Sequence, residues 1–192
     1  MSSEDQQKWD ARYRDGAYGD RPHPTRLLAD WLSRLGTGRA LDLACGAGRN
    51  AVFLAQQGFE VEAMDISMVG LERARQRAED AGVQVDWTQC DLENAEVAAD
   101  RYDLIVVIRY VNRALLARLA DSLVPSGRLL TEQHLMSDES DVGPKDPAFR
   151  MQTGELARLT QGLVTDFYRE ELIEDPDGRK VALAQFVGHK AT

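Results

Sequence analysis

The chain has 192 residues and an acidic balance, with 23 Lys and Arg against 32 Asp and Glu and a formal net charge of −9. This charge disfavours nucleic acid and anionic membranes as main partners, because phosphate groups are bound by clustered Lys and Arg. No run of about eighteen apolar residues occurs, and the polar start of the chain is unlike a secretory signal. We therefore expect a cytoplasmic protein with no membrane segment, either a monomer or a homodimer.

The first 24 residues are expected to stand apart from the core. A helix is predicted through about Arg14, and Trp9 and Tyr13 lie four residues apart, so they share one face of it. The Gly- and Pro-rich loop that follows, residues 16–24, contains Tyr18, Arg21 and His23. An exposed, inert histidine is the more common outcome for His23. The whole chain is expected to form one domain, with residues 1–24 preceding a core at 25–192.

A short apolar strand, Ala40 to Leu43, runs into a glycine-rich turn and then into helical sequence. A backbone that turns tightly beneath a ligand needs positive φ or the absence of a Cβ, and Gly46 and Gly48 supply both. This is the pattern of a nucleotide-binding βαβ unit. Gly46-x-Gly48-x-x-Ala51 also fits the dinucleotide fingerprint, so the turn alone leaves the ligand open.

Two carboxylates narrow the choice of ligand. Asp65 ends the next apolar run and suits a ribose in either case. Asp42 lies just before the turn, where its charge would repel a pyrophosphate and attract a cationic amino group. S-adenosylmethionine has that ammonium group, a ribose and no phosphate. Asp42 therefore favours S-adenosylmethionine over a nicotinamide dinucleotide.

The segment Asp42-x-Ala44-x-Gly46-x-Gly48 resembles motif I of the class I S-adenosylmethionine-dependent methyltransferases, with Ala44 where the family has its first glycine. Met64-Asp65-Ile66-Ser67 resembles their second motif. Trp9-Asp10-x-Arg12-Tyr13, the stretch from Tyr102 to Arg113, and Gly143-Pro144-Lys145 are similar to the small tellurite-resistance-type methyltransferases. The resemblance extends over nearly the whole chain.

The resemblance implies a set of roles for the cofactor site. Asp42 and the glycine turn would hold the methionine part, Asp65 the ribose and Asp91 the adenine amino group, while the first helix and the loop after it would form a lid. The residues expected at the cofactor are Trp9, Tyr13, Asp42, Ala44, Cys45, Gly46, Gly48, Asn50, Asp65, Ile66, Asp91, Leu92 and Arg109. Asp91 is also open to a purely structural role, as a cap or loop residue.

The remaining pattern alternates strands and helices, which indicates a Rossmann-like, seven-stranded, mostly parallel α/β sheet with helices on both faces. Asp175-Pro-Asp-Gly178 is a strong turn signal between two strand-like segments, so the sheet is expected to end in an antiparallel hairpin. Strands are expected at 59–65, 83–89, 102–108, 128–135, 163–171 and 180–187, with a turn at 125–127. Helices are expected from Pro24 or Thr25 to about Leu35, at about 49–57, 67–81, over the apolar stripe that ends at Leu123, and near 153–161.

The residues after the strand 102–108 are candidates for the transfer site, because ligands bind at the carboxyl edge of open α/β sheets. Arg109, Tyr110 and Arg113 are expected to orient the acceptor, with Asn112 beside them. His134, which shares a strand face with Glu132, is the histidine best placed to accept a proton, although a buried structural role is more common. Cys45 and Cys90 form no metal or redox motif, and no metal site is expected.

The sequence therefore indicates a methyltransferase that acts on a small molecule at S, O, N or a metalloid. In-line transfer from a sulfonium needs positioning and water exclusion, so no catalytic triad or metal cluster is required. Two alternatives stay open. One is a non-catalytic protein that binds S-adenosylmethionine or S-adenosylhomocysteine, and the other, less favoured, is an NAD-dependent oxidoreductase.

Overall fold

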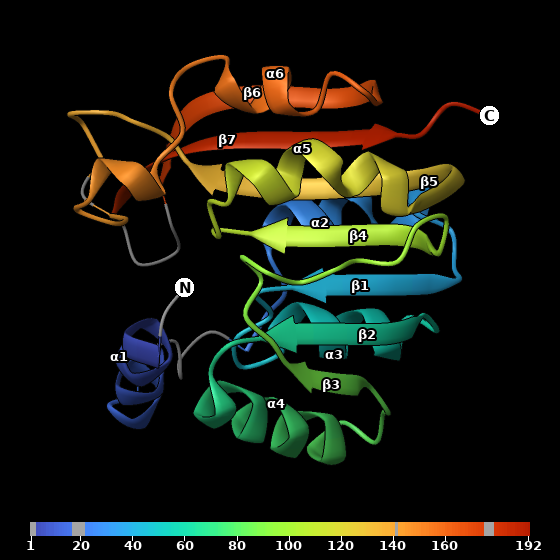
Figure 1. The fold of residues 1–192 in the computed structure, drawn as a ribbon, viewed down its shortest axis with the longest axis vertical. Helices are drawn as coiled ribbons and strands as arrows, with labels where there is room; N and C mark the ends of the chain where they lie inside the picture. Colours follow the sequence, from blue (N-terminus) through green and yellow to red (C-terminus); the bar gives the residue numbers. More distant parts are fainter. Residues whose placement is uncertain (1–2, 17–21, 141, 175–178) are drawn as a thin grey trace.

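The computed structural model describes residues 3–16, 22–140, 142–174 and 179–192 (Figure 1). Its centre is one seven-stranded sheet with the strand order β3-β2-β1-β4-β5-β7-β6. The first five strands run parallel, whereas β7 lies antiparallel to both β5 and β6. The predicted α/β class, the seven strands and the final antiparallel pair are all confirmed. The proposed turn at 175–178 lies outside the described residues.

The strands are β1 (Arg39–Leu43), β2 (Glu60–Asp65), β3 (Asp86–Gln89), β4 (Tyr102–Ile108), β5 (Leu123–His134), β6 (Val164–Glu174) and β7 (Lys180–His189). The helices are α1 (Ser3–Arg14), α2 (Arg26–Trp31), α3 (Arg49–Gln56), α4 (Met68–Asp80), α5 (Arg113–Ser122) and α6 (Glu155–Leu159), with 3-10 turns η1 (Leu32–Arg34) and η2 (Pro147–Phe149).

Two apolar clusters hold the helices against opposite faces of the sheet. Leucines of α5 and α6 pack with Leu41, Ile105 and Leu129 on one face. Side chains of α2, α3 and α4 pack with Ala40 and Leu104 on the other. Because β1 and β4 are covered on both faces, their sequences are apolar almost throughout, as is usual for central parallel strands.

Several element boundaries differ from the prediction. The strand β3 begins at Asp86 instead of residue 83, and α2 gives way to a 3-10 turn at Leu32. The expected turn at 125–127 is part of β5, where the register against β4 shifts and Ser126 adopts a φ of +64°. Within this irregular segment, Ser126 N donates to Lys190 O and Lys190 N donates to Gly127 O, which keeps the segment in the sheet. Tertiary pairing therefore overrides the local Pro-Ser-Gly turn signal.

The carboxyl ends of the parallel strands open toward α1. Figure 1 shows α1 beyond the arrowheads of β1 and β2, next to the start of α4. This is the edge of an open α/β sheet where ligands bind. None of the helices in the described ranges combines the length and the apolar character needed to span a membrane.

Gly48 provides a test of how the glycine turn packs. Its φ is +75°, and a Cβ there would lie 2.7 Å from Ala74 Cβ of α4 and 2.7 Å from the Trp87 ring. Gly58 has a similar φ of +89° with nothing within 4 Å. We expect Gly58→Ala to lower the free energy of unfolding by about 1–2 kcal/mol through backbone strain, and Gly48→Ala by about 1–3 kcal/mol more through overpacking. Equal losses in urea titrations would contradict the close packing.

Candidate functional site

A cavity of about 100 Å³ lies at the carboxyl ends of β1, β2 and β4, beneath α1. It is lined by Trp9, Tyr13, Ala44, Asp65, Ile66, Leu92, Ile108, Arg109 and Tyr110. Apart from Ile108, all of these residues were predicted from the sequence as cofactor or transfer-site residues. The structure thus brings together segments that are far apart in the chain.

Asp65 joins the glycine turn to the start of α4. Its Oδ2 accepts a hydrogen bond from Gly46 N at 2.8 Å, and its Oδ1 accepts one from Ser67 N at 2.8 Å. Burial raises the pKa of Asp65, although the two N–H bonds oppose the increase. Each carboxylate oxygen can accept a second hydrogen bond, so Asp65 can serve the turn and a ligand hydroxyl together.

Asp42 is 1% exposed and lies behind the turn, outside the residues that line the cavity. Its Oδ2 has no hydrogen-bond partner among the described residues. Burial raises the pKa of Asp42 from 3.8 to about 7; the charge of Arg49 opposes this increase, and the charge of Asp65 adds to it. A buried acceptor with unused capacity suits a cationic ligand group. This observation fits the ammonium of S-adenosylmethionine.

The two aromatic residues of α1 pack on each other and on the turn. The ring centroids of Trp9 and Tyr13 lie 6.3 Å apart. A Cβ at Gly46 would overlap the Tyr13 hydroxyl, and one at Gly70 would lie 3.0 Å from Tyr13 Cε2. The helix therefore forms a wall of the cavity, and the tyrosine fits because both neighbours are glycines.

Arg109 is held on the cavity wall by a buried carboxylate. It has a left-handed φ of +58°, a conformation that is costly for residues other than glycine. Its N–H donates to Glu132 O at 2.6 Å, and its Nε donates to Glu132 Oε1 at 3.0 Å. Gln185 Nε2 donates to the other oxygen at 2.8 Å.

Sequence reasoning did not include Glu132 and Gln185 among the site residues. A glutamate in an otherwise apolar strand was the available signal for Glu132. Pairing of β5 with β7 places Gln185 opposite Glu132. This partner could not be predicted from the local sequence of either strand.

Tyr110 stays protonated at neutral pH. Burial raises its pKa to about 12, and a bond with Asn112 opposes the increase. Tyr110 can therefore donate a hydrogen bond but is a poor base. Burial likewise raises the pKa of Cys45 and of Cys90, so neither thiol is activated.

Besides Asp42 and the turn residues Cys45, Gly46 and Gly48, four further predicted site residues lie outside the cavity lining. The amide oxygen of Asn50 accepts from Thr25 N at 2.8 Å and so anchors the start of α2. Arg113 donates to Ala148 O at 2.9 Å and to Arg150 O at 2.8 Å, and it pairs with Glu155. Asp91 accepts from Glu93 N at 3.0 Å in a local turn. His134 is 7% exposed and packs against Gly143.

These contacts give Asn50 and Arg113 structural roles and provide no support for direct binding by either.

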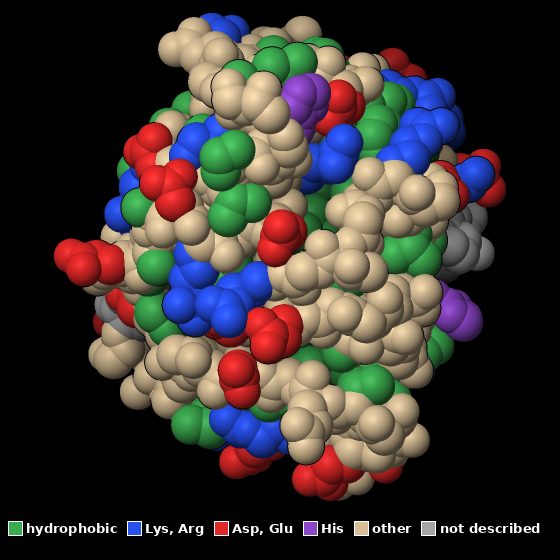
Figure 2. Space-filling model, turned by 90° about the vertical axis from the view of Figure 1, so that its right-hand side faces the viewer, with side chains coloured by type: hydrophobic (Ala, Val, Ile, Leu, Met, Phe, Trp, Pro, Cys, Tyr) green, Lys and Arg blue, Asp and Glu red, His purple; other side chains and the backbone are tan. Residues whose placement is uncertain are grey.

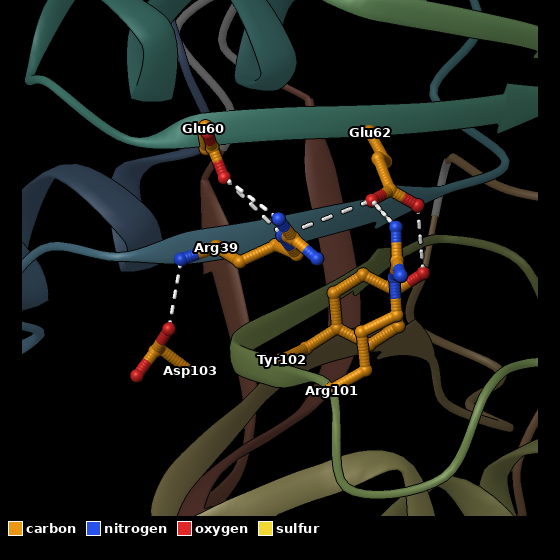
Figure 3. Close-up of polar contacts among 6 residues, drawn as sticks. All are labelled: Arg39, Glu60, Glu62, Arg101, Tyr102 and Asp103. Atoms are coloured by element: carbon orange, nitrogen blue, oxygen red, sulfur yellow. Dashed lines mark hydrogen bonds and ion pairs between the residues drawn. The ribbon is translucent and has the colours of Figure 1, made fainter.

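A larger depression, about 560 Å³, lies at the opposite edge of the sheet, by the amino ends of the strands. Its charged groups pair with one another, as Figure 3 shows: Arg39 bonds Glu60 at 3.0 Å, and Glu62 accepts from Arg101 and from Tyr102. Asp103 Oδ2 accepts from Arg39 N at 2.8 Å, a structural role. On this face acidic side chains lie beside the basic groups (Figure 2). We therefore place the site in the smaller cavity.

Comparison with known families gives a match for residues 40–127, to a methyltransferase domain. This segment contains Asp42, the glycine turn, Asp65 and Arg109, which are the parts of the site described above. Residues 40–127 therefore belong to a methyltransferase domain. S-adenosylmethionine is accordingly the cofactor of this domain, and the unused acceptor on Asp42 fits it.

Two curated methyltransferases are similar to part of the chain. A ribosomal protein L11 methyltransferase from Symbiobacterium thermophilum is 36% identical over 120 residues, which cover 59% of this chain and 39% of that protein. A ubiquinone biosynthesis O-methyltransferase from Erwinia tasmaniensis is 28% identical over 119 residues, covering 57% of this chain and 48% of that protein. The methyltransferase domain thus aligns with less than half the length of each relative.

Solved structures share the fold over most of the chain. TehB from Haemophilus influenzae superposes with a TM-score of 0.75 at 20% identity, covering 93% of this chain and 66% of that one. A geranyl diphosphate methyltransferase solved with GPP and sinefungin gives 0.66 at 19% identity, covering 85% and 76%. The [4+2]-cyclase SpnF gives 0.73 at 13% identity, covering 97% and 95%. The TM-scores show that these proteins share one fold with this chain. Sequence identities this low say nothing about a shared substrate.

The buried carboxylate of Asp42 predicts a pH dependence of stability. Because its pKa is about 7 in the folded protein and near 3.8 when unperturbed, the folded state binds more protons between these values. Stability is therefore lost as pH rises from 4 to 7. Asp42→Asn should remove this loss, and its advantage over wild type should grow by at most about 4 kcal/mol between pH 4 and 7.5. An advantage that does not change with pH in urea titrations would refute this assignment.

Proposed function

We propose that this protein transfers a methyl group from S-adenosylmethionine to a small-molecule acceptor. The observation that carries the proposal is the unpartnered Oδ2 of Asp42, buried beneath the glycine turn among the described residues. A dinucleotide pyrophosphate would be repelled there, whereas an ammonium would supply the missing hydrogen bond. In this proposal residues 25–192 form the catalytic core and α1 covers it.

The cofactor supplies an already activated methyl group, so the protein has mainly to bind, orient and exclude water. Asp42 and the turn from Cys45 to Gly48 would hold the methionine part. Asp65, which lines the cavity, would accept from the ribose hydroxyls. Leu92 and Ile66 would contact the adenine, with Asp91 near its amino group.

The acceptor would lie beside Arg109 and Tyr110. The Arg109 guanidinium is fixed by Glu132, and the protonated Tyr110 hydroxyl can donate to an acceptor oxygen or sulfur. Because Tyr110 is a poor base, deprotonation of a weakly acidic acceptor would need another group. His134 remains the sequence-based candidate, and its position outside the cavity lining gives it no further support.

A binding protein without transferase activity is the second candidate. The fold is compatible with it, because the methyltransferase fold is not confined to methyltransferases: SpnF, named a [4+2]-cyclase, has the same fold over nearly the whole chain. Fold alone therefore leaves the reaction open. A screen of small thiols, phenols, amines and metalloid oxyanions with radiolabelled S-adenosylmethionine distinguishes the two. We expect label in at least one class, and a blank screen with a cofactor-binding protein would favour the second candidate.

Calorimetric titration should detect S-adenosylmethionine and S-adenosylhomocysteine, with dissociation constants of about micromolar order, and no heat with NAD. Binding of NAD without the sulfonium pair would overturn the proposal and the interpretation of Asp42.

Asp65→Asn provides the internal test of this site. The amide keeps the shape of the side chain and one acceptor, whereas alanine would remove both backbone contacts and destabilise the turn. Loss of a charged hydrogen bond should weaken S-adenosylhomocysteine binding by roughly ten- to a hundredfold. Asp86→Asn, which removes the same charge at the exposed start of β3, is the control and should bind as wild type does. Equal affinity of both variants would remove Asp65 from the ribose site.

A further inference from the structure

A buried carboxylate, Asp10, attaches α1 to the rest of the protein. It is 8% exposed, although it lies in a helix whose other acidic residues, Glu4 and Asp5, are at its open first turn. Its Oδ1 accepts from Ser67 Oγ at 2.6 Å and from Val69 N at 3.2 Å. A carboxylate at the amino end of α4 is also favoured by the helix dipole.

Ser67 connects this contact to the cofactor site. It is the N-cap of α4, where its Oγ accepts from Gly70 N at 3.0 Å. Its own N–H donates to Asp65, and Asp65 in turn accepts from Gly46 N. Four consecutive hydrogen-bonded residues therefore run from α1 to the glycine turn.

The helix α1 forms part of the cavity wall. Trp9 and Tyr13 belong to α1 and form part of the wall, and Lys8 of the same helix lies over the Phe149 ring at 5.8 Å. The cavity of about 100 Å³ is well below the roughly 300–1,000 Å³ of sites for ligands of this size. The site must therefore widen to take a nucleoside-sized ligand, and α1 supplies two of the residues that line it.

We propose that Asp10 is a positioning residue that latches α1 onto α4, and that release of this latch limits both the arrival and the departure of the cofactor. This inference rests on the proposed function. If the hydrogen bonds of Asp10 are formed both in the free protein and in the cofactor-bound protein, they stabilise these two states equally. Their loss should therefore change the rates far more than the equilibrium.

The kinetic pattern separates a latch from two simpler roles. A residue that contacts the cofactor would, when removed, increase the dissociation rate and weaken the affinity together. A residue that only stabilises the fold would change the unfolding free energy and leave the binding rates alone. A latch alone increases both rates by a similar factor.

The experiment measures association and dissociation of S-adenosylhomocysteine by stopped-flow fluorescence for wild type, Asp10→Ala and Glu4→Ala. Alanine removes the Oδ1 that accepts both bonds of the latch. Glu4 is exposed on the same helix, so its variant matches the charge change without touching Ser67. We expect both rate constants of Asp10→Ala to rise about tenfold, or about 1.4 kcal/mol in each barrier, with the dissociation constant within about threefold of wild type. Glu4→Ala should behave as wild type.

Amide hydrogen exchange gives a second readout that needs no ligand. Asp10→Ala should accelerate exchange in α1 while the amides of β4 keep their protection. Unchanged rates and unchanged α1 exchange in a folded variant would overturn the latch, as would a rise in dissociation rate alone with weaker affinity. If the wild-type protein itself does not bind S-adenosylhomocysteine, the proposed function is wrong and the kinetic measurement cannot be made. Amide hydrogen exchange then tests by itself whether Asp10 holds α1 in place.

Discussion

The carboxylate of Asp65 is the contact on which the geometry of the site depends. Its two oxygens accept from Gly46 N and Ser67 N, so one side chain at the end of β2 fixes the glycine turn and the first turn of α4 together. Ala44, at the start of the turn, lines the cavity, and Ser67 connects α4 to α1. Loops that must place several groups within hydrogen-bond distance need such a shared anchor, because their own backbones have few internal bonds.

The sequence predicted those parts of the fold that depend on local pattern. Ser67 is the N-cap that its position before an apolar helical run indicates, and the glycine turn and Asp65 occupy the predicted edge of the sheet. Boundaries were missed where a partner strand decides them. The Pro125–Gly127 segment has a strong turn composition, yet it lies within β5, between two residues that pair with β4, and its own backbone bonds go to Lys190.

In the site, too, the residues that belong to a local motif were predicted, whereas the contacts between distant residues were not. Residues carried by a motif, such as Trp9 and Asp65, lie at the cavity as expected. Arg113 follows the same strand as Arg109 and has the same chemistry, but its guanidinium is directed to Glu155 and to two backbone carbonyls. Glu132 was noticed as a polar residue in an apolar strand, and its function as the partner of Arg109 depends on a contact 23 residues away in sequence. Such pairings depend on tertiary packing, so they cannot be predicted from the spacing of residues along the sequence.

Ala44 has a further consequence for how the site is maintained. It stands at the end of β1 with a φ of +55° and lines the cavity, although left-handed backbone costs a residue with a Cβ about 1–2 kcal/mol. The surrounding sheet and turn over-determine this conformation, so the strain persists in the folded protein. The methyl group thereby adds apolar surface to the wall at a place where glycine would relax the backbone. At Ala44 the backbone thus keeps a conformation that the residue alone would not adopt, because the packing of the whole fold stabilises it.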